Sequence, residues 1–369
     1  MSELPFFAAA REFAALRDTL MPVIEDALAG GRALQGEPVR AFEDALAAFT
    51  GRRHAVAVGS GTDALAFALV AHDVGPGDEV LVPAFSFIAS ASCVLRAGAR
   101  PVFVDVDVHG LLDLDDAAAK VTPRTRAIVA VQLYGQMLDP DALEAFAAAH
   151  GLVLVEDAAQ ALGATASGRP CGSIGHASAC SFDPTKILSA PGSGGAVLCD
   201  DDALADRLRR LRWHGRDASG AYSELGHNSQ LPSASAAALL VKLSRQPAWT
   251  ARRVAIASRW TSALDGSPTD APVVLPGRTH VFHKYVVRTD ARHAVRERLA
   301  AAGVPTLVHY ATGLHRQPVF APHDPGPCPS ADALAATVLS LPIHAFLIDD
   351  EVEHVERVLT ELAEQPVSR

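Results

Sequence analysis

Cysteine is scarce in this chain of 369 residues, which contains five, and no two of them form a C-x-x-C pair. Their odd number and irregular spacing argue against a disulfide framework and predict reduced thiols, as in a cytosolic protein. The chain also lacks the H-E-x-x-H pattern of zinc enzymes and the G-x-S-x-G pattern of serine hydrolases. We therefore expect neither a metal site nor hydrolase chemistry of either kind.

Long apolar runs and basic clusters are missing as well. No uninterrupted apolar segment approaches the roughly 18–20 residues that a membrane span needs, and the N-terminus lacks the basic stretch of a secretory signal. The formal net charge is −10, and no basic run is interleaved with aromatic residues, which argues against a nucleic-acid surface. These absences predict a cytoplasmic protein with no membrane partner and no nucleic-acid partner.

Short apolar segments alternate with helical patterns in the first part of the chain. Each of these segments is rich in Val, Leu, Ile or Ala, which is typical of strands that are buried on both faces. Strands that alternate with helices predict an α/β fold whose central sheet is mostly parallel. The predicted strands are residues 54–58, 80–82, 101–105, 127–131 and 152–155.

The pattern changes after about residue 243. A long helical segment at 246–264 precedes a connector at 265–277 that is rich in Pro, Gly and Asp. We therefore predict a large domain over residues 1–245, which includes an N-terminal arm, and a smaller α+β domain over residues 246–369. The elements predicted after the connector are strands at 283–288 and 306–309 and helices at 291–302 and 349–364.

The two most informative residues are Asp157, which ends the apolar segment VLVEDAAQ (153–160), and Lys186, which lies in the segment SFDPTKILSAPGSGG (181–195). An acid at a strand end and a loop lysine are what the chemistry of pyridoxal phosphate (PLP) requires. The lysine amine forms a Schiff base with the PLP aldehyde, and the carboxylate pairs with the protonated pyridine nitrogen, which makes the ring an electron sink. Taken singly, Asp157 could cap a helix and Lys186 could be a surface charge.

A phosphate group needs several hydrogen-bond donors in one place. The Gly-Ser-Gly-Thr segment at 59–62 lies between a predicted strand and a predicted helix, where free backbone N–H groups and the helix dipole favour an anion. Ser181 could add a hydroxyl group. An ordinary helix cap is the alternative for residues 59–62, and an ordinary strand-end serine is the alternative for Ser181.

The cofactor ring and the substrate also need partners. Phe85 and Phe87 follow a predicted strand, and either could stack on the ring, although a buried core position is the commoner fate of a phenylalanine. His309, Tyr310 and His315 lie close together in the sequence. They are candidates for substrate contacts, and loop residues without such a role are the alternative.

Taken together, these residues resemble the nucleotide-sugar aminotransferases of the DegT/StrS type, a branch of the fold-type-I PLP enzymes. The resemblance covers nearly the whole chain and rests on many short motifs in one order. It implies the fold-type-I architecture, with a mostly parallel sheet in the large domain and a smaller C-terminal α+β domain. The motifs are GSGTDALAFAL (59–69), EVLVPAFSFIASA (79–91), GARPVFVDVD (98–107), VQLYGQ (131–136), VEDAAQALGA (155–164), SFDPTK (181–186), RWHGR (212–216), HVFHKYVVR (280–288), GVPTLVHY (303–310), LHRQP (314–318) and LSLPIH (339–344).

The resemblance also implies a role for each candidate residue. Lys186 would hold PLP as the internal aldimine and carry the proton between the substrate and cofactor carbons, while Asp157 would pair with the pyridine nitrogen. Gln160 would contact the cofactor 3-hydroxyl group, and Phe87 would stack on the ring. A homodimer with shared active sites is implied as well. The groups that would hold the phosphate are Gly61, Thr62, Ser181 and, from the second subunit, Asn228.

The reaction implied is the transfer of an amino group from glutamate or glutamine to a keto sugar, linked to a nucleotide, as in amino-sugar and natural-product biosynthesis. A keto-cyclitol aminotransferase and a PLP-dependent sugar dehydratase are alternatives, although the resembling dehydratases replace the lysine by histidine. A third alternative is a non-catalytic homologue that acts as a partner or regulator. Its support is that Ile187, Ser193 and the segment at 230–237 depart from the usual pattern of the family.

Overall fold

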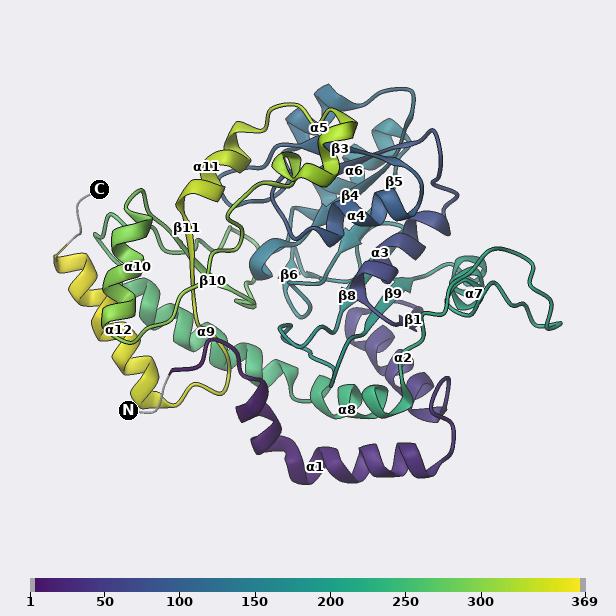
Figure 1. Cartoon of the computed structure of the whole chain (residues 1–369), viewed down its shortest axis with the longest axis horizontal. Helices are drawn as coiled ribbons and strands as arrows, with labels where there is room; N and C mark the ends of the chain where they lie inside the picture. Colours follow the sequence, from purple (N-terminus) through teal and green to yellow (C-terminus); the bar gives the residue numbers. More distant parts are fainter. Residues whose placement is uncertain (1–3, 366–369) are drawn as a thin grey trace.

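The structure is a computed structural model that describes residues 4–365 (Figure 1). Its centre is a seven-stranded sheet with the strand order β1-β9-β8-β5-β4-β2-β3. The strands from β8 to β3 pair in parallel, whereas β9 runs antiparallel to both of its neighbours, β8 and β1. The prediction of a mostly parallel sheet is confirmed. The strand bounds are β1 (His54–Val58), β2 (Glu79–Pro83), β3 (Arg100–Val104), β4 (Thr125–Val131), β5 (Val153–Asp157), β8 (Ala177–Ser181) and β9 (Gly195–Cys199).

Helices cover the sheet because its strands are apolar on both faces, and β2 and β9 are buried along their whole length. Helix α3 is itself buried on nearly every side and packs against α4, β8 and β9. Helix α1 lies along α8, away from the sheet (Figure 1). The helices of this part are α1 (Ala9–Ala29), α2 (Glu37–Thr50), α3 (Gly61–Val70), α4 (Ala89–Arg96), α5 (Leu114–Lys120), α6 (Pro140–His150), α7 (Asp202–Leu211) and α8 (Ser233–Leu243).

The C-terminal part builds a second hydrophobic core around Trp260, Tyr285 and Val355, which the N-terminal residue Leu4 joins. Helix α11 packs instead on the main core through Leu334. These packing relations do not test the predicted division between residues 245 and 246, which stays a prediction. The elements are α9 (Gln246–Ala263), β10 (Tyr285–Arg288), α10 (Arg292–Ala301), α11 (Pro329–Thr337), β11 (Val338–Leu341) and α12 (Asp349–Glu364).

One predicted strand was wrong. Residues 306–309 form no strand, and only Leu307 makes an isolated bridge, to Ser340. The reason is that the chain turns away from β11 after this bridge and directs Tyr310 toward a cavity described below. Short elements elsewhere connect the larger ones. They are the hairpin β6 (Thr165–Ala166) and β7 (Arg169–Pro170) and the 3-10 helices η1 (Leu133–Gly135), η2 (Leu314–Arg316) and η3 (Pro318–His323).

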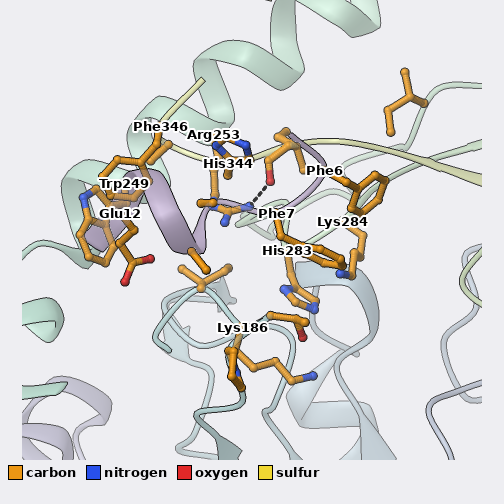
Figure 2. Close-up of a pocket in the computed structure, with 18 residues that line it drawn as sticks. Phe6, Phe7, Glu12, Lys186, Trp249, Arg253, His283, Lys284, His344 and Phe346 are labelled. Atoms are coloured by element: carbon orange, nitrogen blue, oxygen red, sulfur yellow. Dashed lines mark hydrogen bonds between the residues drawn. The ribbon is translucent and has the colours of Figure 1, made fainter. Parts of the chain in front are cut away.

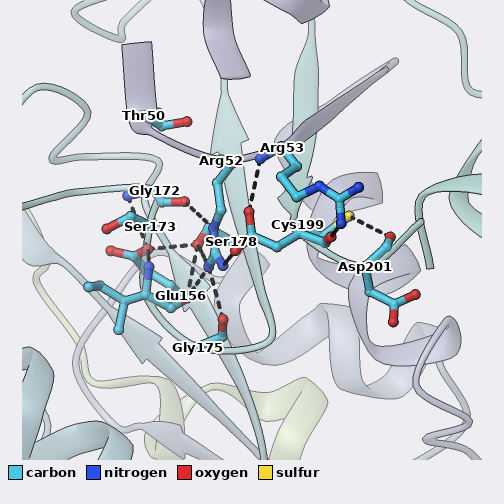
Figure 3. Close-up of polar contacts among 12 residues, drawn as sticks. Thr50, Arg52, Arg53, Glu156, Gly172, Ser173, Gly175, Ser178, Cys199 and Asp201 are labelled. Carbon is cyan, nitrogen blue, oxygen red and sulfur yellow. Dashed lines mark hydrogen bonds and ion pairs between the residues drawn. The ribbon is translucent and has the colours of Figure 1, made fainter. Parts of the chain in front are cut away.

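A buried polar network fixes β5 between its neighbours. Glu156 accepts hydrogen bonds from the Ser178 hydroxyl at 2.7 Å and from the backbone N–H groups of Gly172 and Ile174 at 3.0 and 3.1 Å. Arg52 donates to the carbonyl groups of the same turn, at 3.0 Å for Gly172 and 2.7 Å for Ile174 (Figure 3). Because side chains alternate along a strand, anchoring Glu156 on one face directs the next residue to the other face.

Replacing Arg52 by methionine is expected to lower the free energy of unfolding by about 3 kcal/mol, because buried carbonyl groups lose their donor. Arg53 is the matched control, since its exposed side chain contacts Asp200 and Asp202 at the surface. Its replacement by methionine is expected to cost less than about 1 kcal/mol. Urea unfolding of both variants measures the difference, and equal losses would contradict a structural role for the buried guanidinium group.

Candidate active site

A cavity of about 370 Å³ opens at the carboxyl ends of the parallel strands. This edge is where α/β sheets bind ligands, because loops from several strands meet there. The start of α3, the end of β5 and the loop after β8 contribute most of its walls. The polar side chains among its lining residues are Ser60, Thr62, Ser90, Asp157, Gln160, Ser181, Asp183, Thr185, Lys186, Ser193, His283, Lys284, His309 and Tyr310.

Asp157 is the last residue of β5 and pairs in register with Val131 of β4 and Ala179 of β8. One carboxylate oxygen accepts the Ser90 hydroxyl at 2.8 Å, and the other accepts the backbone N–H of Ala159 at 3.1 Å. Burial raises the pKa of Asp157, and these hydrogen bonds oppose that rise. The carboxyl group is therefore held in one orientation, and a cation beside it would lower its pKa again.

Lys186 lies in the loop between β8 and β9. Its backbone N–H donates to the Asp183 carbonyl at 2.9 Å, and Phe182 anchors both ends of the loop through bonds to Gly194 and Ala190 at 2.8 Å. Burial lowers the pKa of Lys186, while the negative charges of Asp157 and Asp183 oppose the decrease. A lysine with a lowered pKa has a larger neutral fraction, which is the form that acts as a nucleophile and a base.

The start of α3 forms a small cradle next to Ser181. A Cβ atom placed on Gly61 would lie 2.6 Å from Cβ of Ser181, so only glycine fits this approach. Helix α3 spans ten residues from Gly61 to Val70, and Ser60 caps it through a bond from the Asp63 N–H at 3.1 Å. The cradle therefore combines backbone donors at a helix N-terminus with the hydroxyl groups of Thr62 and Ser181. These donors fit the phosphate of PLP.

Gln160 and Tyr310 lie on the other side of the cavity. The Gln160 side chain accepts the Tyr134 backbone N–H at 3.1 Å and donates to the Tyr310 hydroxyl at 3.4 Å. Phe87 is half exposed at the mouth, with its ring centroid 6.3 Å from that of Tyr310. His309 also lines the cavity, and its ring nitrogen Nδ1 lies 2.9 Å from the Ser340 hydroxyl.

Two predicted site residues are not among the residues that line the cavity. Asn228 is exposed on the loop before α8, where Gln230 donates to it at 3.0 Å. His315 is buried, and its Nε2 lies 3.1 Å from a carboxylate oxygen of Asp332. Their predicted roles in phosphate and substrate binding stay predictions.

Several residues in or beside the cavity had no role assigned from the sequence. Ser90 orients Asp157, and Tyr134 supports Gln160, although both lie in quoted motifs without an assigned role. Lys284 and His283 follow one another before β10 and line the same cavity as Lys186. The three residues also line an adjoining pocket, which Figure 2 shows. The rarity of lysine in this chain is a signal that could have drawn attention to Lys284.

No group of three or more His, Cys, Asp or Glu residues within 4–365 is placed to hold a metal ion. Over the same residues, no helix is long and apolar enough to cross a membrane. The five cysteines are buried and unbonded to one another.

A mostly parallel sheet that carries a buried acid at one strand end, a desolvated loop lysine and a phosphate cradle defines the class of PLP-binding α/β enzymes. Within this class, the sequence model of the DegT/DnrJ/EryC1/StrS aminotransferase family matches residues 15–360. The chain belongs to this family, and the predicted resemblance is confirmed. A relative from Streptomyces venezuelae, the dTDP-3-amino-3,4,6-trideoxy-alpha-D-glucose transaminase, is 40% identical over 98% of this chain and 97% of its own.

Solved structures agree with this assignment. The crystal structure of S. venezuelae DesV in complex with a ketimine intermediate has a TM-score of 0.96 at 40% identity, covering 99% of this chain and 100% of that one. The PLP form of the sugar aminotransferase Spr1654 from Streptococcus pneumoniae, which is described as putative, has a TM-score of 0.87 at 27% identity, covering 95% and 97%. The predicted fold class is confirmed by this likeness.

Proposed function

We propose that this protein is a PLP-dependent aminotransferase that moves an amino group from glutamate or glutamine to a nucleotide-linked keto sugar. The proposal rests on one observation. Asp157, Lys186 and the Gly61 cradle line the same cavity. Family membership and the sugar transaminases among the relatives support the reaction class. The retained lysine favours transamination over the dehydratase alternative.

PLP, when bound, supplies an aldehyde that accepts the amino group and a ring that stabilises negative charge on the neighbouring carbon. The residues of the chain prepare the site for this chemistry. Lys186 Nζ takes the proton from the α-carbon of the donor and later delivers a proton to the carbon that receives the amine. Asp157 keeps the ring nitrogen protonated, and Ser90 holds that carboxylate in place. Thr62, Ser181 and the start of α3 hold the phosphate.

The proposed assembly is a homodimer in the cytoplasm. Asn228 is exposed and lies outside the cavity of its own chain, so it is free to reach the phosphate cradle of a second subunit. Light scattering after gel filtration tests this part, because a mass of twice 38.6 kDa is expected. A monomeric mass with full activity would contradict the shared site.

The experiment that tests the function is a visible absorption spectrum with PLP, followed by addition of L-glutamate or L-glutamine. A band that forms with PLP and disappears with a donor is the expected result, because the cofactor takes up the amine. Addition of a nucleotide-linked keto sugar should then restore the band and yield the amino sugar, detected by mass spectrometry. A band that persists with both donors would contradict the proposed donors.

A further inference from the structure

Lys284 is a buried cation with no anionic partner. It is 7% exposed and borders the cavity that contains Lys186. Within residues 4–365, its ammonium group makes no hydrogen bond or ion pair, and its neighbours are the ring faces of Phe7 at 5.0 Å and Phe6 at 5.9 Å. Figure 2 shows Lys284, these two rings and Lys186 on the walls of an adjoining pocket, which Arg253 also lines. A desolvated ammonium without a partner is costly unless a ligand supplies the compensating charge.

The charged groups around Lys284 favour the binding of an anion. Burial, together with the positive charges of Lys186 and Arg253, lowers the pKa of Lys284 to about 7, while Asp183 opposes the decrease. The ammonium form is therefore only partly populated at neutral pH without a ligand. An anion that docks beside Nζ would favour the charged form.

Two histidines extend the polar surface next to Lys284. Burial lowers the pKa of His283 well below its usual value, and it lowers the pKa of His309 to about 4. Both imidazoles are therefore neutral at physiological pH and add no competing positive charge. The Nδ1 atom of His283 is buried without a hydrogen-bond partner in the described residues, so a ligand oxygen or hydroxyl group can pair with it.

The reaction itself requires a negative charge close to Lys186. In an α-amino acid, the carbon that loses its proton carries the carboxylate directly, so this carboxylate must enter the cavity with the amine. Among the described lining residues, Lys186 and Lys284 are the two cationic side chains other than histidine, and Lys186 is committed to proton transfer. Arg253 lines the adjoining pocket and not this cavity, and its guanidinium group donates to the carbonyl groups of Phe282 and Ile343. Lys284 is thus the cationic side chain of the cavity that is left to receive a carboxylate.

We propose that Lys284 binds the α-carboxylate of the amino donor, with His283 beside it. This inference rests on the proposed function, because it needs an α-amino acid as the donor. It explains why two of the four lysines of the chain lie in one cavity. The same chemistry would also suit the carboxylate of an acidic sugar, so the test includes probes for both sources.

The central variant is Lys284→Met, which keeps most of the length of the side chain and removes the charged group. We expect the concentration of L-glutamate for half-maximal loss of the visible band to rise about 10- to 100-fold, as for a lost charge-assisted hydrogen bond. The rate at saturating donor should change much less. Lys120→Met is the matched control, because Lys120 pairs with Asp116 and the Phe103 carbonyl outside the cavity, and its donor dependence should equal that of the native protein.

A donor analogue locates the carboxylate that Lys284 contacts. L-isoglutamine carries an amide in place of the α-carboxylate, and the native holoenzyme should use it at least about 10-fold less well than L-glutamate. In Lys284→Met the ratio of the efficiencies with L-glutamate and L-isoglutamine should fall close to one, because the cation that distinguishes a carboxylate from an amide is gone. An unchanged preference in the variant would overturn the assignment.

Binding measurements supply a readout that does not depend on turnover. Calorimetric titration with glutarate, which has two carboxylates and cannot react, should show weaker binding to Lys284→Met than to the native holoenzyme. The dissociation constant of PLP should be unchanged. A native protein that binds glutarate but reacts with no donor would contradict the proposed function and leave the carboxylate site supported. Equal glutarate binding in both proteins would overturn the inference alone.

Two nucleotide sugars test whether Lys284 binds the carboxylate of an acidic sugar instead of that of the amino donor. UDP-glucuronate and UDP-glucose differ in a single carboxylate, and both should bind the Lys284→Met variant as they bind the native holoenzyme. The variant could instead lose affinity for UDP-glucuronate alone, while its affinities for glutamate and glutarate are unchanged. Lys284 would then bind the carboxylate of an acidic sugar, and the donor assignment would be overturned.

Discussion

Lys186→Ala is expected to lose the visible absorption band of the PLP-loaded protein and at least about 10⁴-fold in transamination rate. The lysine supplies both the amine that bonds to the cofactor aldehyde and the group that moves the proton, and positioned proton transfer alone contributes about 10²- to 10⁴-fold. Absorption spectroscopy and a single-turnover assay with L-glutamate measure the two losses separately.

Lys186→Arg is the appropriate control for charge. Its guanidinium group stays protonated and cannot bond to the aldehyde, so the band should be absent here too, although the positive charge is retained. Circular dichroism should show a native fold in both variants, because the Lys186 side chain makes no hydrogen bond in the described part of the molecule. A normal visible band in Lys186→Ala would contradict the assignment of this residue.

Asp157→Asn is expected to reduce the transamination rate by about 100-fold or more while PLP stays bound. The amide keeps the shape of the carboxylate but lacks the charge that holds the ring nitrogen protonated, and removal of one preorganised electrostatic group costs about 10²- to 10³-fold. The Ser90 hydroxyl can still donate to the amide oxygen, so the local structure is retained. Steady-state kinetics together with a PLP titration measure the two quantities.

The pH dependence provides a further check on Asp157. Burial raises the pKa of this carboxyl group, and the Ser90 bond and the positive charge of Lys186 oppose the rise. The native rate should therefore fall as the pH decreases through the pKa of Asp157, because the protonated acid cannot pair with the ring cation. The Asn variant should lack this decrease, and a rate close to the native one would count against the role of Asp157.

The local features of the site were predictable from the sequence. The apolar run at 153–156 ends in Asp157, and the structure places this acid at the end of β5. The loop formers around Lys186 indicated an irregular segment, and the lysine does lie in a loop beside the cavity. Helix α12 covers the predicted residues 349–364 because its amphipathic pattern is a property of nearby residues alone.

Long-range pairing was less predictable. Strand β9 is built largely of small and apolar residues and carries no alternation that marks it, and its antiparallel direction depends on β1 and β8. The strand predicted at 306–309 was wrong for the same reason. Its residues suit a strand, but only Leu307 pairs with β11, through a bridge to Ser340. Strand formation requires a partner, and the partner is distant in the sequence.

The sequence by itself determined the α/β class, the family, the acid at the end of β5 and the loop lysine, because each depends on short motifs and local patterns. Only the tertiary structure decided that Lys284 and His283 converge on Lys186 from about a hundred residues away, and that Asn228 lies outside the cavity. Burial and the absence of a partner for a charge are set by how distant segments pack. They change a pKa or create a binding site only after the chain has folded.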